Sequence, residues 1–217
     1  MSDLKGLESA GIEVAALIRN PSYTGDELRR IKLVSGPLTT DASWYAQACG
    51  NYSGGQPDVP FDVGMGGITY KSFWNPYPQF KDTNNLSLVV FIKYANFKML
   101  FPGDLEKDGW KALLQREDFR FELAGTEVLM ASHHGRENGY CEDIFKYFTP
   151  SCVVISDKPI MHATQQMVPD YRKVIRAQGV KVRTTMKDRH VLTTRRDGWI
   201  VFDVDDQNYT VDTEYRG

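Results

Sequence analysis

Cysteine is scarce in this sequence, and the few that occur form no pattern. The chain has 217 residues and three cysteines, Cys49, Cys141 and Cys152, which are widely separated. An odd number without a Cys-x-x-Cys pair predicts neither a disulfide framework nor a cysteine-rich metal site. Such usage is typical of a reducing compartment, and we expect a cytoplasmic protein.

Long apolar runs and an excess of one charge are also missing. No stretch is apolar for long enough to cross a bilayer, and the N-terminus lacks the basic-then-apolar pattern of a signal peptide. The formal net charge of −2 gives no electrostatic reason to expect nucleic acid or an acidic membrane surface as a partner. The sequence also lacks a P-loop, a glycine-rich dinucleotide turn and a nucleophile elbow.

What the sequence does contain is an alternation of strand and helix patterns. Helices are expected at 3–19, 25–35, 104–116, 140–148 and 165–178. Strands are expected at 68–74, 86–94, 97–101, 127–132, 151–156, 180–185 and 199–204. The section 36–78 is rich in Gly, Pro, Ser and aromatic residues, and its part 54–60 is typical of a loop. This alternation, with no internal repeat, predicts one layered α/β domain over residues 1–217.

Polar groups that suit a metal site follow two of the apolar strands. Asp104 comes after the strand at 97–101, and His133-His134-Gly135 comes after the strand at 127–132. The ends of buried strands are where an α/β fold presents functional groups. Carboxylate and imidazole are ligands for zinc, manganese and iron. In a hydrolytic site, two such ions lie roughly 3.5–4 Å apart and activate a water.

Each of these groups also has an ordinary structural explanation. Asp104 is well placed to cap the helix that follows it. A His-His pair in a loop can be held by backbone groups alone, and the Asn-Asn-Leu-Ser stretch at 84–87 can be a turn stabilised by its own side chains. In the functional interpretation, Asn85 and Ser87 donate to a substrate oxygen. His162 precedes a helix, and His190 is expected at the surface.

Taken together, the motifs Asn84-Asn85-Leu86-Ser87-Leu88-Val89, Phe101-Pro102-Gly103-Asp104 and Ser132-His133-His134-Gly135 resemble the metallo-β-lactamase superfamily. The similarity is to the branch with a domain like that of the DNA-uptake protein ComEC, and Val153-Val154-Ile155-Ser156 matches a further strand of that branch. The resemblance covers residues 84 to about 204.

The resemblance implies a four-layer αββα sandwich and a hydrolase that uses two divalent ions, zinc or manganese, mostly on phosphodiesters. By position, Asp104 resembles the bridging aspartate and His133 a late histidine ligand, so both are expected to bind metal. His134 would be their catalytic neighbour. Asn85, Ser87 and His162 would contact substrate, which is a nucleic acid or a nucleotide phosphodiester.

The sequence departs from this family in one important respect. The H-x-H-x-D-H motif, which supplies most of the metal ligands in relatives, is absent. Residues 1–7 resemble those that follow this motif, so the resemblance implies an N-terminally truncated domain without its first strands. We expect weak or no activity from this chain alone, unless an N-terminal segment or another chain complements it. The alternative is a non-catalytic scaffold that keeps the fold and binds a partner or nucleic acid.

Overall fold

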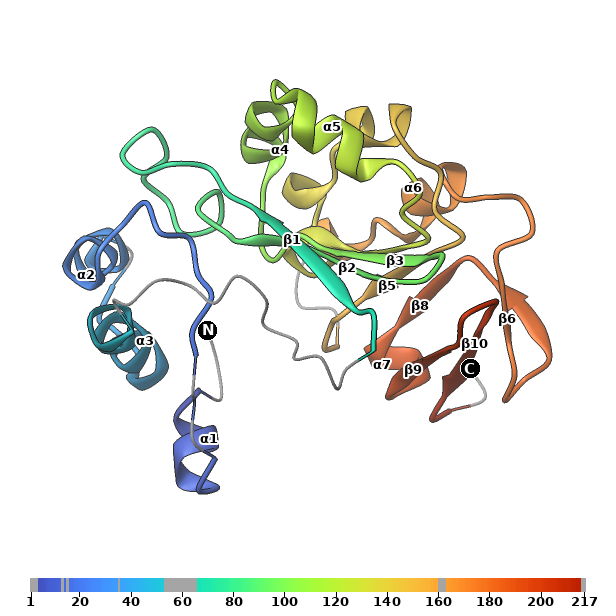
Figure 1. Ribbon diagram of the computed structural model, residues 1–217, viewed down its shortest axis with the longest axis horizontal. Coiled ribbons are helices and arrows are strands. Elements are labelled where there is room, and N and C mark those ends of the chain that lie inside the picture. Colours follow the sequence, from blue (N-terminus) through green and yellow to red (C-terminus); the bar gives the residue numbers. More distant parts are fainter. Residues whose placement is uncertain are drawn as a thin grey trace.

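The chain folds into two β-sheets with helices, a mixed α/β architecture (Figure 1). The computed structural model describes residues 4–12, 14, 16–34, 36–52, 66–159 and 163–215. Its α-helices are α1 (Leu4–Ser9), α2 (Gly25–Leu33), α3 (Thr40–Asn51), α4 (Lys107–Leu113), α5 (Glu117–Leu123), α6 (Val168–Lys173) and α7 (Thr194–Asp197). Within the described residues, no helix is both long and apolar enough to cross a membrane.

The larger sheet has six strands in the order β1-β2-β3-β4-β5-β8. They are β1 (Thr69–Phe73), β2 (Val89–Tyr94), β3 (Phe97–Phe101), β4 (Val128–Met130), β5 (Cys152–Ile155) and β8 (Val191–Thr193). The first three strands pair antiparallel, and β3, β4, β5 and β8 pair parallel. The carboxyl ends of the parallel strands β3, β4 and β5 therefore meet at one edge of the sheet, which becomes the candidate site.

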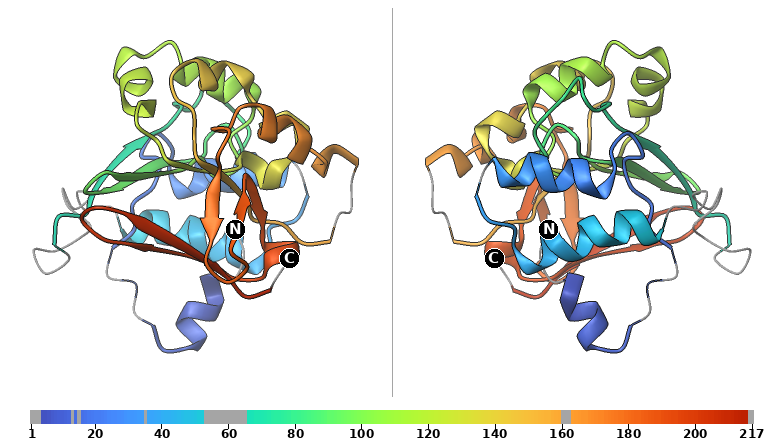
Figure 2. Two further views of the ribbon diagram at one scale, coloured as in Figure 1. Left: turned by 90° about the vertical axis from the view of Figure 1, so that its right-hand side faces the viewer. Right: turned by 90° about the vertical axis from the view of Figure 1, so that its left-hand side faces the viewer.

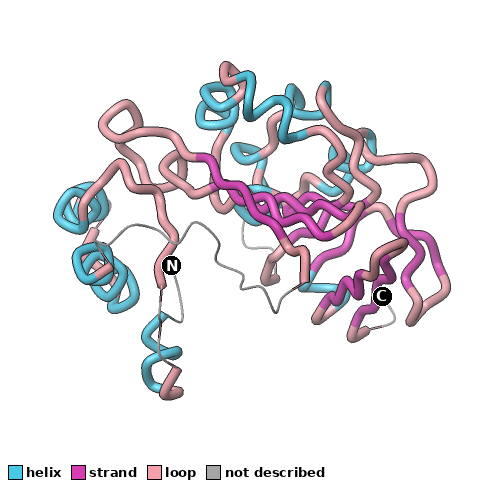
Figure 3. Tube along the Cα trace, in the orientation of Figure 1, coloured by secondary structure: helices cyan, strands magenta, loops and turns pink. Residues whose placement is uncertain are grey.

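The smaller sheet has four strands in the order β7-β6-β10-β9. They are β6 (Val180–Val182), β7 (Lys187–Arg189), β9 (Ile200–Val204) and β10 (Tyr209–Thr213). Figure 2 shows this sheet stacked below the larger one, on the face away from α4, α5 and α6. The tube in Figure 3 shows the same three layers, with α2 and α3 set to one side.

Two separate apolar cores hold these layers together. Between the larger sheet and its helices, Phe73, Phe91 and Phe119 meet edge to face, with ring centroids 5.0–6.0 Å apart. Between the two sheets lies a second core, which includes Val128, Val154, Val182 and Val211. The valines of β4 and β5 are buried, as expected for parallel strands covered on both faces.

The two sheets leave an opening between them. A cavity of about 380 Å³ there is lined by Ile92, Phe97, Met99, Phe101, Met130, Val154, Ile200, Phe202 and Val204. The adjoining strand β9 is the last in its sheet, and its Val201 is 47% exposed. Another strand or another chain can cover apolar side chains that are exposed at an open sheet edge.

The sequence placed most strands correctly but several helices less well. The helix expected at 3–19 ends at Ser9, because the chain turns at Gly11, whose φ of 71° is left-handed. The stretch expected as a helix at 140–148 forms 3₁₀ turns over Glu142–Lys146 instead. The helix expected at 165–178 is confined to α6.

Helix α3 was not expected from the sequence, because Gly, Ser and aromatic residues dominate its surroundings. Its start is fixed by Thr39, whose side chain accepts a hydrogen bond from the Ala42 N–H. Its buried residues Ala42, Ala46 and Cys49 recur at helical spacing, and α3 lies beside α2. All three cysteines are buried and unbonded, and burial raises the pKa of the Cys152 thiol to about 12.

Candidate functional site

Asp104 stands at the carboxyl end of β3, in a turn held by Ser87. The Asp104 N–H donates to the Ser87 hydroxyl oxygen over 3.1 Å. Gly103 precedes it with a φ of 62°, and a side chain there would come within 3.2 Å of Ser87. A glycine is therefore needed for the chain to turn this close to Ser87. The turn leaves the Asp104 side chain 43% exposed.

The His-His-Gly stretch follows β4 and lies against this turn. It forms a 3₁₀ turn over Ser132–Gly135, in which His133 and His134 both have left-handed backbones with φ of 50° and 56°. The His133 N–H donates to the Gly103 carbonyl over 3.1 Å, and the Ser132 hydroxyl donates to the Leu105 carbonyl. The two loops that were predicted from separate motifs therefore meet.

Of the two imidazoles, His134 is the one beside Asp104. Its Nδ1 lies 2.7 Å from the Ser156 carbonyl oxygen, and since a carbonyl only accepts, Nδ1 carries the ring proton. The lone pair is then on Nε2, which lies 3.6 Å from Asp104 Oδ1. An imidazole held through one nitrogen by a backbone carbonyl is the usual arrangement of a metal-binding histidine. His134 is 51% exposed, so a ligand can reach it.

His133 turns toward a different set of groups. Its Nδ1 lies 3.3 Å from Glu106 Oε1 without an aligned hydrogen bond, and its Nε2 lies 3.5 Å from Arg136 Nη1. Glu106 Oε1 also accepts from the side-chain amides of Asn84 and Asn138, each over 2.8 Å. The ring is buried among these groups. A metal-binding role for His133 stays a prediction, and its ring nitrogens lie nearest to Glu106 and Arg136 among the contacts given above.

The predicted substrate-binding residues differ in where they lie. Asn85 is buried: its Oδ1 accepts from the Gly109 N–H and its Nδ2 donates to Asp82. Both ends of its amide therefore bond within the protein and stabilise the start of α4. Ser87 lies at the site, where it holds Asp104. His162 lies outside the described residues.

A cavity of about 180 Å³ adjoins Asp104, and sequence reasoning did not anticipate it. Its lining includes Ser87, Arg19 and Lys32, the last from α2. The Arg19 guanidinium donates to the carbonyls of Asn20, Tyr23 and Cys49. The half-buried Lys32 ammonium has no ion pair or hydrogen bond within the part of the chain that the structure describes. Two cations beside a carboxylate and a hydroxyl suit an anionic group that is bound together with a metal ion.

Helix α2 reaches this edge because the preceding segment is anchored there. The Asn20 side-chain amide is buried and donates to the carbonyls of Asn75 and Leu86. Tyr23 and Leu28 then pack with Leu86 and the α3 residues in a small apolar cluster. Neither Lys32 nor Glu106 belongs to a sequence motif that would mark it as a site residue. Only the folded arrangement brings them to the site.

The described residues fit a metal ion only in part. No group of three or more His, Cys, Asp or Glu side chains gathers to hold an ion anywhere in the described ranges. Asp157 lies near enough to His134 to interact electrostatically, but its side chain is buried and pairs with Arg195 Nη1 at 3.0 Å. Burial raises the pKa of Asp157 above its usual range. Asp104 and His134 would supply only two of the three or four protein ligands of a zinc site.

The comparisons with known proteins add no family to these observations. Neither protein-family models nor curated proteins give a match to the sequence. The resemblance to the metallo-β-lactamase superfamily accordingly rests on the motifs alone.

The left-handed backbone at His134 leads to a stability prediction. Replacing His134 by Gly or by Ala removes the same imidazole, but only Ala keeps a Cβ that crowds a left-handed backbone. The Gly variant should be more stable than the Ala variant by about 1 kcal/mol. Urea unfolding of both variants measures this difference. Equal stabilities, or a more stable Ala variant, would mean that the backbone here is not left-handed.

Proposed function

We propose that this chain is a hydrolase domain of the metallo-β-lactamase type, similar to the ComEC branch, that acts on phosphodiesters. Asp104 and His134 are two of its metal ligands, for zinc or manganese. The observation that carries the proposal is the orientation of His134, whose Nδ1–H is bound by the Ser156 carbonyl while Nε2 faces Asp104 at 3.6 Å. This assignment exchanges the roles that the motif comparison gave to His133 and His134.

The substrate's phosphate is assigned to the cavity beside Asp104. Lys32 and Arg19 give it a positive wall, and the Ser87 hydroxyl offers a donor. A phosphate there would lie beside the exposed Asp104 and His134 side chains. Positive groups next to a metal site favour a phosphoester over a neutral substrate.

The finer architecture is also part of the proposal. A helical layer, the six-stranded sheet and the four-stranded sheet supply three layers of the family's αββα sandwich. The apolar opening between the sheets and the exposed edge of β9 support a further element that packs there, either an N-terminal complementing segment or a separate chain.

The small number of metal-binding side chains favours a second possible function. Because Asp104 and His134 have no third metal ligand beside them in the described residues, the same fold can serve as a non-catalytic domain that binds an anion. Lys32 and Arg19 would then hold a phosphate without cleaving it.

Hydrolysis of bis-p-nitrophenyl phosphate distinguishes these functions. We expect slow turnover that depends on added zinc or manganese and is lost in Asp104→Ala. Full turnover in that variant would contradict the metal role of Asp104. Saturable phosphate binding without any turnover would favour the non-catalytic domain.

The phosphate site is tested separately at Lys32. Removing its charge in Lys32→Ala should weaken binding of inorganic phosphate about tenfold, as expected for loss of one charge-assisted hydrogen bond. Lys93 is an exposed lysine of β2 outside this cavity, and Lys93→Ala is the matched control. Isothermal titration with phosphate measures both. Equal affinities for the two variants would remove Lys32 from the site.

A further inference from the structure

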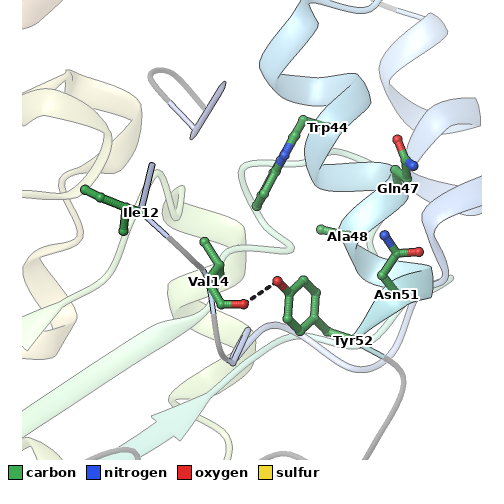
Figure 4. A pocket seen from close by; sticks show the side chains of 7 residues that line it. All are labelled: Ile12, Val14, Trp44, Gln47, Ala48, Asn51 and Tyr52. Carbon is green, nitrogen blue, oxygen red and sulfur yellow. Dashed lines mark hydrogen bonds between the residues drawn. The ribbon is translucent and has the colours of Figure 1, made fainter. Parts of the chain in front are cut away.

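A second cavity lies away from the candidate site, on the opposite flank of α3. Its volume is about 350 Å³, and it is lined by Ile12, Val14, Trp44, Gln47, Ala48, Asn51 and Tyr52. No residue of this lining belongs to the cavity beside Asp104. Figure 4 shows Trp44 and Tyr52 at two sides of the space, with Ala48 between them. A volume of this size is within the range of small-molecule sites.

The lining residues come from two elements with different roles. Trp44, Gln47, Ala48 and Asn51 follow one another at helical spacing and share one face of α3. The buried residues Ala42, Ala46 and Cys49 recur at helical spacing elsewhere on α3, and the cluster with α2 contains the last two. The Trp44 face is therefore not used to pack α3 against α2. Ile12 and Val14 close the other side, where the Val14 carbonyl accepts a hydrogen bond from the Tyr52 hydroxyl.

The polar groups of this cavity indicate the chemistry of its ligand. The indole N–H of Trp44 and the side-chain amides of Gln47 and Asn51 make no hydrogen bond with any described residue, and none of the described lining residues carries a charge. An uncharged ligand with both donors and acceptors along one edge would satisfy the amides. A flat aromatic face would stack on Trp44. Gln47 and Asn51 are exposed, so their amides can exchange bound water for the donors and acceptors of a ligand, whereas an anion would find no cation in this lining.

We propose that this cavity binds a nucleobase, with the ring stacked on Trp44 and its edge read by Gln47 and Asn51. Adenine suits it well, since a side-chain amide pairs with the N6 and N7 edge of that base through two hydrogen bonds. Aromatic side chains are the usual stacking partners of unpaired bases. The base can belong to a free nucleoside or to a single-stranded nucleic acid, and both present the same edge. The proposal does not depend on hydrolysis at Asp104.

Calorimetric titration of the full chain with adenosine and with a ten-nucleotide oligodeoxyadenylate tests this proposal. We expect saturable binding of at least one of them and none of ribose, which has neither a base nor a phosphate. Tighter binding of the oligonucleotide would assign the base to a nucleic-acid strand, and binding of adenosine alone would assign it to a free nucleoside. Saturable binding of neither probe, or equal binding of ribose, would overturn the proposal.

Variants locate the binding in this cavity. Gln47 and Asn51 are exposed, so the double variant Gln47→Ala, Asn51→Ala keeps the fold and should weaken binding about ten- to hundredfold. Gln178→Ala removes an exposed amide outside the cavity and should bind as the unmodified chain does. Trp44→Ala should also lose binding. Because removing this large side chain can disturb α3, the double variant of Gln47 and Asn51 is the decisive test. Unchanged affinity in that double variant would contradict the assignment.

Discussion

Replacing Trp110 by Ala should lower the free energy of unfolding by about 3–5 kcal/mol. Trp110 is only 1% exposed and lies in α4, in the core between the larger sheet and its helices. Its ring packs beside Phe119, with centroids 6.2 Å apart. Its indole N–H also donates to the Gly139 carbonyl over 3.1 Å, so the variant leaves both a large void and an unpaired buried carbonyl.

The matched control for Trp110 is Trp199. It is 53% exposed, and Trp199→Ala should change the free energy of unfolding by less than about 1 kcal/mol. Urea unfolding followed by circular dichroism measures both variants. A similar loss in both would mean that α4 does not pack on the sheet in the way described here. Because Gly139 closely follows His-His-Gly, the same contact couples the core to the candidate site.

Replacing Asp197 by Ala should cost about 3–5 kcal/mol, the range for removing one partner of a buried ion pair. Asp197 is fully buried at the end of α7. Its Oδ1 lies 3.0 Å from Arg189 Nη1, and its Oδ2 accepts from the Thr193 N–H over 2.7 Å. The variant leaves the mostly buried Arg189 cation of β7 without its partner. It also leaves the Thr193 N–H, at the end of β8, without its acceptor.

An exposed ion pair of the smaller sheet is the control for Asp197. Asp212 pairs with Arg183, whose side chain is 56% exposed, and exposed pairs contribute at most about 1 kcal/mol. Asp212→Ala should therefore have a small effect in the same unfolding experiment. If Asp197→Ala were as mild as Asp212→Ala, the buried pair of Asp197 with Arg189 would not join α7 to β7.

Much of this fold could be predicted because strands and turns are encoded locally. The apolar runs at 86–94, 97–101 and 151–156 contain β2, β3 and β5, and the ends of parallel strands must meet at one edge. That rule alone brings Asp104 and the two histidines together. The two-sheet division could not be predicted in the same way, because it depends on long-range pairing such as β6 with β10.

The details of the candidate site were harder to predict because they depend on backbone geometry and on distant segments. Which imidazole faces Asp104 is decided by the left-handed turn at His133 and His134, and adjacent residues in a sequence do not reveal such a turn. Lys32 is distant from Asp104 in sequence, and it reaches the cavity through the anchored Asn20 and the packing of α2. Asn85 was expected to contact substrate for the same reason. Its sequence neighbours do not reveal that its amide forms hydrogen bonds with Gly109 and Asp82 instead.

We propose that Asp104 and His134, rather than Asp104 and His133, form the metal-binding pair. Calorimetric titration with zinc of the chain and of the variants His133→Asn and His134→Asn tests it most directly. Asn tolerates a left-handed backbone, so both variants keep the turn. We predict that His134→Asn weakens zinc binding at least about tenfold and that His133→Asn changes it much less. Loss of binding in His133→Asn with unchanged binding in His134→Asn would make His133, and not His134, the metal ligand.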